Sequence, residues 1–170
     1  MQVNWIPFFS QTGNEIASII ENGIEPVMIV TNRTDTNYNE VLKKFNVLHF
    51  TEFNELFKLK EFMSNNIVTL HGFLRIIPEF MITDHMYNGH PGLITKYPFL
   101  KGKDPQVKAY NLKLPSSGSV IHAVTPEVDS GEVILSKEVS IEGLSLDSVF
   151  KILHDVSLDL WLQFFEGIYK

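Results

Sequence analysis

Three short apolar runs lie between Ile67 and Gly131, and each is followed by polar residues and Gly or Pro: Ile67-Val68-Thr69-Leu70, Met86-Tyr87-Asn88 and Ser119-Val120-Ile121-His122-Ala123-Val124. This punctuation is typical of an open α/β sheet, whose strands end at one crevice. If the three runs are neighbouring strands, the Asn88 amide, the His90 imidazole and the Asp129 carboxylate meet at that crevice. We therefore predict a functional site there.

Strands and helices alternate through the first half of the chain. Strands are expected at 3–9, 26–31, 47–50, 67–70 and 86–88, and helical segments at 15–22, 38–45 and 52–63. This order predicts a Rossmann-like α/β fold with a doubly wound, mostly parallel sheet. Residues 118–124 and 132–141 alternate in polarity, which predicts an antiparallel C-terminal strand pair, and the apolar segment 146–165 predicts a final helix.

The composition limits the class of protein. The chain has 170 residues, 44 % of them hydrophobic, which fits one domain with a full core. The net charge is −6, with Lys and Arg scattered, so we expect no nucleic-acid partner, although a small phosphorylated substrate is compatible. The absence of Cys excludes disulfides and thiolate metal sites.

No apolar run is long enough for a membrane span, and the first residues lack the features of a secretory signal. These observations predict a soluble cytoplasmic protein with no membrane partner. They leave the oligomeric state open.

A polar turn, Ser10-Gln11-Thr12-Gly13-Asn14, joins the first expected strand to the first expected helix. Backbone N–H groups at such a place can hold an anion, so Gly13 and Asn14 are candidate substrate-binding residues; an ordinary βα loop is an equally good interpretation. The turn matches neither a dinucleotide-binding nor a P-loop pattern. Glu15 suits the first helical turn but would compete with a phosphate.

Each candidate catalytic residue also has a structural interpretation. Asn88-Gly89 is a common tight-turn pair, His90 alone is an ordinary structural histidine, and Asp129 before Ser-Gly is an ordinary turn residue. Together they suit acyl transfer to an amine: an amide donates to the oxyanion, an imidazole relays the proton, and a carboxylate holds the imidazolium. No Ser, Cys or Lys is placed as a nucleophile, so direct attack by a substrate amine is the simplest scheme.

These residues resemble the folate-dependent formyltransferases, most closely those that act on glycinamide ribonucleotide. The resemblance covers Val3 to Ile141, and its motifs are Gly72-Phe73-Leu74-Arg75-Ile76-Ile77, Asn88-Gly89-His90-Pro91, Tyr97-Pro98, Gly118-Ser119-Val120-Ile121-His122 and Val128-Asp129-Ser130-Gly131. It implies one formyltransferase catalytic domain over residues 1–170. It also implies that Asn88, His90 and Asp129 are catalytic and that 10-formyltetrahydrofolate is the formyl donor, with no metal.

By the same resemblance, two segments line the pterin pocket: Leu74, Arg75, Ile76 and Ile77 in the first, and Val124, Thr125, Glu127 and Val128 in the second. His122 matches a second histidine of the family and is assigned to the substrate side. The sequence departs from the family at Glu15 and in the final helix, where apolar residues, or Lys151 and His154, replace the residues that contact the acceptor. Lys101 and Lys103 offer charge to an anionic acceptor or are simply solvated.

The predicted function is therefore formyl transfer to a primary amine of a small substrate in purine biosynthesis, with glycinamide ribonucleotide as the leading acceptor. An amino-sugar nucleotide or another small amine is the alternative within this class. Because no C-terminal β-barrel follows, we do not expect a whole-tRNA substrate. The rivals from other classes are a folate-binding protein that has lost catalysis and, less favoured, a metal-dependent hydrolase, since six His are present but no H-E-x-x-H pattern.

Overall fold

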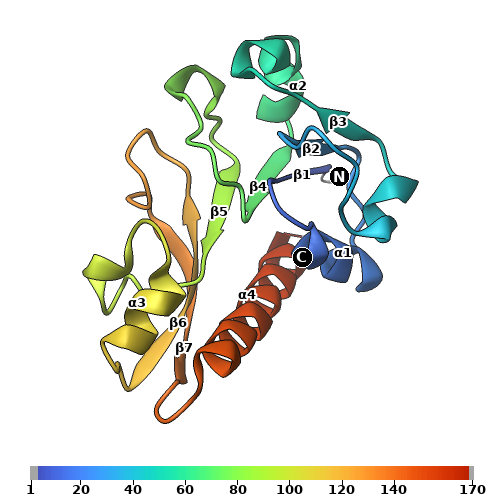
Figure 1. The fold of residues 1–170 in the computed structure, drawn as a ribbon. Helices are drawn as coiled ribbons and strands as arrows, with labels where there is room; N and C mark the ends of the chain where they lie inside the picture. Colours follow the sequence, from blue (N-terminus) through green and yellow to red (C-terminus); the bar gives the residue numbers. More distant parts are fainter. Residues whose placement is uncertain (1–3, 169–170) are drawn as a thin grey trace.

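One sheet organises the computed structural model, which describes residues 4–168. Within these residues it has seven strands in the order β3-β2-β1-β4-β5-β6-β7 (Figure 1). Strands β1 to β5 are parallel, and β6 and β7 are antiparallel, which confirms the predicted fold class. The strands are β1 (Trp5–Phe9), β2 (Ile29–Thr31), β3 (Val47–His49), β4 (Ile67–His71), β5 (Met86–His90), β6 (Ser116–Ala123) and β7 (Val133–Ser140). Val3, expected in the first strand, lies outside the described residues.

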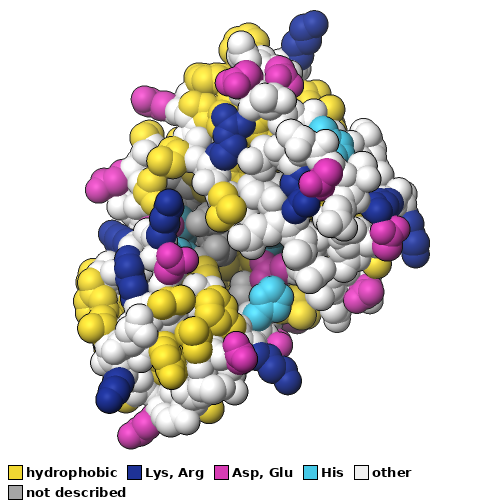
Figure 2. All heavy atoms as spheres, in the orientation of Figure 1, with side chains coloured by type: hydrophobic (Ala, Val, Ile, Leu, Met, Phe, Trp, Pro, Cys, Tyr) yellow, Lys and Arg dark blue, Asp and Glu magenta, His cyan; other side chains and the backbone are white. Residues whose placement is uncertain are grey.

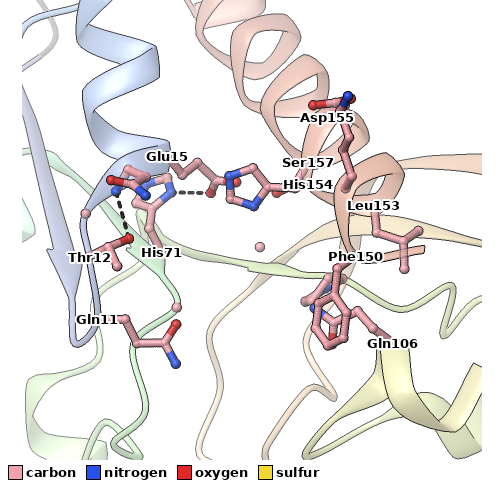
Figure 3. Close-up of a pocket in the computed structure, with 16 residues that line it drawn as sticks. Gln11, Thr12, Glu15, His71, Gln106, Phe150, Leu153, His154, Asp155 and Ser157 are labelled. Atoms are coloured by element: carbon pink, nitrogen blue, oxygen red, sulfur yellow. Dashed lines mark hydrogen bonds and ion pairs between the residues drawn. The ribbon is translucent and has the colours of Figure 1, made fainter. Parts of the chain in front are cut away.

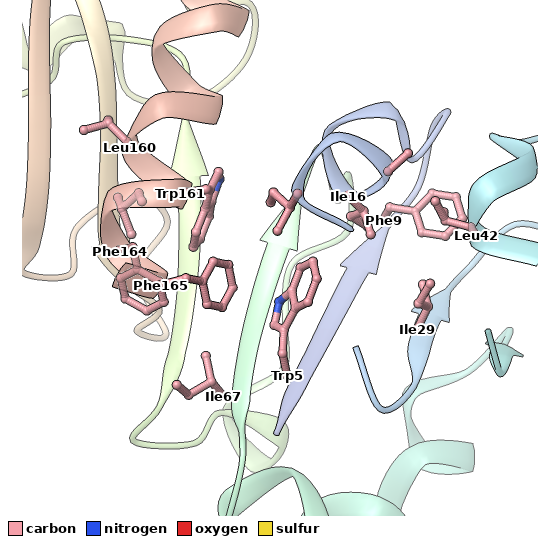
Figure 4. Packing of buried hydrophobic residues seen from close by; sticks show 13 residues of the cluster. Trp5, Phe9, Ile16, Ile29, Leu42, Ile67, Leu160, Trp161, Phe164 and Phe165 are labelled. Atoms are coloured by element: carbon pink, nitrogen blue, oxygen red, sulfur yellow. The ribbon is translucent and has the colours of Figure 1, made fainter. Parts of the chain in front are cut away.

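Alternating side chains of β1 supply two separate cores. Trp5 and Phe9 pack with helices α1 (Asn14–Glu21) and α4 (Leu146–Ile168), as Figure 4 shows. Ile6 and Phe8 point to the other face, toward the segment that ends in α2 (Lys60–Ser64). Because side chains alternate along a strand, a strand covered on both faces is apolar throughout, as β1 is.

The short helical segments are tighter than predicted. Glu40–Lys44 and Phe53–Leu59 are 3-10 helices (η1 and η2), and α2 continues the second of them. Further single turns, η3 and η4, lie at Glu79–Met81 and Pro98–Leu100, and α3 (Pro105–Asn111) follows. Over such short lengths, the spacing of apolar residues does not separate a three-residue period from a 3.6-residue period. The helical segments expected at 38–45 and 52–63 were therefore correctly placed, but their 3-10 geometry was not predicted.

Strand β5 continues through Asn88, Gly89 and His90, so the tight-turn interpretation of Asn88-Gly89 is wrong. A neighbouring strand overrides the local turn preference, because β6 pairs with β5 along this whole length. Gly89 also meets α4 closely: a Cβ at this position would lie 2.9 Å from Trp161 Nε1. Glycine therefore allows the helix to pack directly against the strand.

The direction of β6 also corrects one expectation. Its last residue, Ala123, pairs with Tyr87 near the start of β5, so the carboxyl ends of β5 and β6 lie at opposite edges. The expected convergence of three carboxyl ends holds for β4 and β5 only. Asp129 therefore reaches the site by way of the loop between β6 and β7.

Candidate active site

Strand pairing and the β6–β7 loop bring together the three residues predicted to be catalytic. Asn88 lies opposite His122 in the β5–β6 ladder, with its Nδ2 3.3 Å from His122 Nε2. Asp129 sits between two imidazoles, with Oδ2 3.5 Å from His90 Nδ1 and Oδ1 3.3 Å from His122 Nε2. Asn88 and His90 are two residues apart in an extended strand, so their side chains share a face.

Fixed acceptors assign the protons of the two imidazoles. His90 Nε2 lies 2.8 Å from the Leu100 carbonyl, and His122 Nδ1 lies 2.9 Å from the Ala123 carbonyl. A carbonyl oxygen only accepts hydrogen bonds, so each of these nitrogens carries a proton. The opposite nitrogen of each neutral ring therefore faces Asp129, where a second proton on either ring would be stabilised by the carboxylate.

Burial and charge oppose each other at this cluster. Burial lowers the pKa of His90 below its ordinary value, and the Asp129 charge only partly offsets it. For Asp129, burial acts to raise the pKa, but the contact with the His122 imidazole, the charge that His90 carries when protonated and the Gly102 N–H outweigh it, and the pKa is lowered. Asp129 is thus held in its ionised form. The neighbouring His90 resists protonation because it is buried.

Two further groups in this cluster, both from the backbone, were not predicted from the sequence. The Leu100 carbonyl accepts from His90, and the Gly102 N–H donates to Asp129 Oδ2 at 2.8 Å. Both belong to the turn at 98–102, which covers the site and leaves His90 and Asp129 only 6 % and 7 % exposed. Backbone groups carry no signature in residue type.

The two segments assigned to the pterin border a common core. Ile77 is buried in the cluster that includes Met86, and Val124 packs against the same cluster. Apolar side chains of both segments face solvent: Leu74 is 70 % exposed, Ile76 69 % and Val128 49 %. Exposed apolar groups of this kind can pack against a flat heteroaromatic ligand.

Polar contacts shape these segments. Arg75 donates to the Thr51 carbonyl and lies 4.5 Å from the centre of the Phe53 ring. Thr125 Oγ1 donates to the Glu127 carbonyl at 3.0 Å and so stabilises the turn before Asp129. Val124 N donates to the Met86 carbonyl at 2.9 Å, which ties this segment to the start of β5.

A pocket of about 460 Å³ adjoins the trio. It lies between the start of α1, the ends of β4 and β5, and the first half of α4, and Figure 2 shows this face of the molecule hollowed, with acidic and histidine side chains at the margin. Gly13 and Asn14, the candidate substrate-binding residues, line it together with Glu15. Gly13 has a φ of 71° and no room for a Cβ beside Leu42. His122 does not line it but lies with the trio.

Two predicted substitutes for acceptor contacts, Lys151 and His154, also line this pocket. His71 lines it as well and was not among the predicted site residues. Its Nδ1 lies 2.7 Å from Glu15 Oε1, and Figure 3 shows this pair and His154 together at the α1 end of the pocket. A pair separated by 56 positions has no local sequence signal.

Among residues 4–168, no group of three or more His, Asp or Glu side chains is arranged to hold a metal ion. No helix in the same range is long and apolar enough to cross a membrane.

The chain is similar to several curated formyltransferases over part of their length. It is 37 % identical to phosphoribosylglycinamide formyltransferase of Dictyostelium discoideum, across 49 % of this chain and 45 % of that protein. It is 33 % identical to the Escherichia coli protein of the same name, across 45 % of this chain and 36 % of that protein. It is also 31 % identical to methionyl-tRNA formyltransferase of Thermotoga neapolitana, across 48 % of this chain and 26 % of that protein. The chain thus aligns with less than half the length of each of these relatives.

Solved structures show the same fold over nearly the whole chain. Phosphoribosylglycinamide formyltransferase of Streptococcus pneumoniae superposes with a TM-score of 0.86 at 21 % identity, covering 99 % of this chain and 100 % of that chain. The Campylobacter jejuni protein of the same name gives a TM-score of 0.87 at 22 % identity, covering 100 % and 99 %. The formyl transferase family profile matches residues 14–158, which include the whole trio and most of the pocket. The chain therefore belongs to the formyl transferase family.

Proposed function

We propose that this protein transfers a formyl group from 10-formyltetrahydrofolate to a primary amine of a small acceptor. The observation that carries the proposal is the cluster of Asn88, His90 and Asp129, joined within 3.5 Å through His122. Phosphoribosylglycinamide is the leading acceptor, because relatives and fold neighbours bear its name. An amino-sugar nucleotide is the alternative. A single catalytic domain over 1–170 and a cytoplasmic location remain predictions.

Each member of the trio has a chemical role. 10-Formyltetrahydrofolate supplies a formyl carbon, which the acceptor amine attacks. One Nδ2 hydrogen of Asn88 points to His122, and the second is available to donate to the formyl oxygen as negative charge develops on it. His90 takes up on Nδ1 the proton that the attacking amine loses, and the Asp129 carboxylate stabilises the resulting imidazolium. His90 then returns this proton to the folate nitrogen as its bond to the formyl carbon breaks.

The two halves of the site bind the two substrates. Leu74, Ile76 and Val128 offer apolar surface to the pterin. The pocket beside Gly13 and Asn14 holds the acceptor, since it opens next to Gly89 and Pro91, which flank His90. The turn at 98–102 holds His90 and Asp129 in place through the Leu100 carbonyl and the Gly102 N–H.

The test is a transfer assay. The protein is incubated with 10-formyltetrahydrofolate and either phosphoribosylglycinamide or an amino-sugar nucleotide, and release of the deformylated folate is followed. We expect acceptor-dependent release that His90→Asn abolishes and that the exposed control substitution Asp84→Asn leaves unchanged. Folate binding without turnover on any amine would instead support the rival function, a folate-binding protein without catalysis.

A further inference from the structure

The α1 end of the acceptor pocket is built around a fixed carboxylate. Glu15 is the second residue of α1, and its side chain is only 13 % exposed. His71 Nδ1 lies 2.7 Å from its Oε1, and Ser157 of α4 also donates to the carboxylate. The side chain is therefore held between strand β4 and helix α4, while it still lines the pocket.

A chain of buried hydrogen bonds supports this carboxylate from behind. Trp5 Nε1 lies 2.6 Å from Thr69 Oγ1, and Thr69 Oγ1 lies 2.7 Å from His71 Nε2. The indole only donates, so the Thr69 hydroxyl accepts from it and donates its own hydrogen to His71 Nε2. A neutral His71 then donates from Nδ1 to Glu15, so every side-chain polar group in this series of hydrogen bonds has a partner.

The same contacts keep Glu15 charged. Burial acts to raise the pKa of this carboxyl, but the hydrogen bonds from His71 and Ser157 and the nearby His154 outweigh it and lower the pKa. Turning the carboxylate out of the pocket would leave His71 without its acceptor, which is costly for a buried donor. Glu15 is thus a permanent negative feature of the pocket wall.

We propose that Glu15 sets the acceptor specificity of this pocket, because its carboxylate accepts hydrogen bonds from a hydroxyl or ammonium group of the acceptor and excludes a phosphate from the start of α1. The identity of the ligand as the acceptor rests on the proposed function. The first turn of α1 offers backbone N–H groups and a favourable dipole to an anion. The ionised Glu15 carboxylate lies in the same turn and repels a phosphate that would bind there. Asp155 adds a second negative charge to the pocket lining.

The remaining charges of the lining do not reverse this polarity. Lys151 and His154 lie on α4, and both are exposed. A phosphate on the acceptor would be placed toward solvent, where it adds little to binding. A ribosyl amine is therefore expected to bind through its hydroxyl groups at Glu15, and its phosphate is dispensable.

Two acceptors that differ only in the phosphate test this: phosphoribosylglycinamide and its dephosphorylated riboside. For the unmodified protein we expect kcat/KM values within about threefold of each other. Glu15→Gln keeps an oxygen for His71 but removes the charge, and should shift the ratio at least tenfold toward the phosphorylated acceptor. Glu21→Gln, an exposed position of the same helix outside the pocket, should not change the ratio. A tenfold preference for phosphate in the unmodified protein, or an unchanged ratio in Glu15→Gln, overturns the proposal.

A binding measurement separates this proposal from formyl transfer. Titration of the protein with inorganic phosphate, followed by phosphorus NMR, should show at least tenfold tighter binding to Glu15→Gln than to the unmodified protein. If neither acceptor is formylated but phosphate binding changes in this way, the proposed function fails and phosphate exclusion by Glu15 stands. If transfer proceeds and phosphate binds both proteins equally, the role of Glu15 fails and the proposed function stands.

Discussion

Asp129→Asn removes one charge from the centre of the predicted catalytic cluster and changes little else. The substituted amide has nearly the same shape, and its oxygen can still accept from the Gly102 N–H. The lost term is the attraction between a carboxylate and an imidazolium that forms on His90, across 3.5 Å. With an effective dielectric of about 20, two charges about 4 Å apart attract by roughly 4 kcal/mol.

That energy sets the size of the expected effect. Partial solvent access reduces it to about 3 to 4 kcal/mol, which corresponds to a rate loss of roughly 10² to 10³. Because the imidazolium forms during transfer, we expect kcat to fall while KM for the folate changes little. The pKa of His90 should also move further below its ordinary value, since the Asp129 charge acts to raise it.

The assay measures release of deformylated folate at saturating substrates, with NMR titration of the His90 ring as a second readout. Asp84→Asn is the matched control, because Asp84 is exposed and lies outside the cluster. A rate within about threefold of the unmodified protein, with folding intact, would refute the role given to Asp129. An unchanged pKa of His90 would refute the electrostatic coupling on which the estimate depends.

Three further outcomes follow from the packing and charges. Gly89→Ala should cost about 1 to 3 kcal/mol in denaturant unfolding, because its Cβ would lie 2.9 Å from Trp161 Nε1, whereas Gly167→Ala, with nothing within 4 Å, should be neutral or stabilising. Acid should destabilise the protein from about pH 7 downward, because burial lowers the pKa of His90 below its ordinary value of 6.5 and the unfolded chain therefore binds a proton that the folded chain resists. The urea midpoint of unfolding should be lower at pH 5 than at pH 7, and this difference should be smaller in His90→Asn. Arg75→Ala should raise KM for the folate more than it lowers kcat in the transfer assay, because Arg75 braces the predicted pterin segment against Phe53, while the exposed Lys58→Ala should do neither.

Most of the fold follows from local patterns in the sequence. Apolar runs separated by helical segments predicted the parallel strands, and alternation at 118–124 and 132–141 predicted the β6–β7 pair. The length of β5 was not predictable in this way, because it depends on pairing with β6 and on the contact between Gly89 and Trp161. Both partners are distant in sequence, and they override the turn preference of Asn88-Gly89.

In the candidate site, too, the sequence predicts the side chains that suit the chemistry but not the groups that tertiary contacts bring in. Asn88, His90 and Asp129 were predicted from residue types that suit acyl transfer, and the structure brings them together. Leu100 and Gly102 were missed because they act through backbone atoms. The Glu15–His71 pair was missed because the two residues are 56 positions apart, and only the approach of α1 to the end of β4 brings them into hydrogen-bond contact.

The antiparallel direction of β6 is what makes the site possible. It places His122 opposite Asn88 in the ladder, so the two side chains meet without any loop. The loop from 124 to 132 must then run back along the strand to deliver Asp129 to both imidazoles. It does so under tight constraint: Asp129 has a φ of 53°, and a Cβ on Gly131 would collide with the Ala123 carbonyl. Few residues tolerate a positive φ, so the loop is locally strained where it holds one carboxylate between two histidines. Replacing Gly131 should therefore impair the cluster even though this residue has no side chain to contribute.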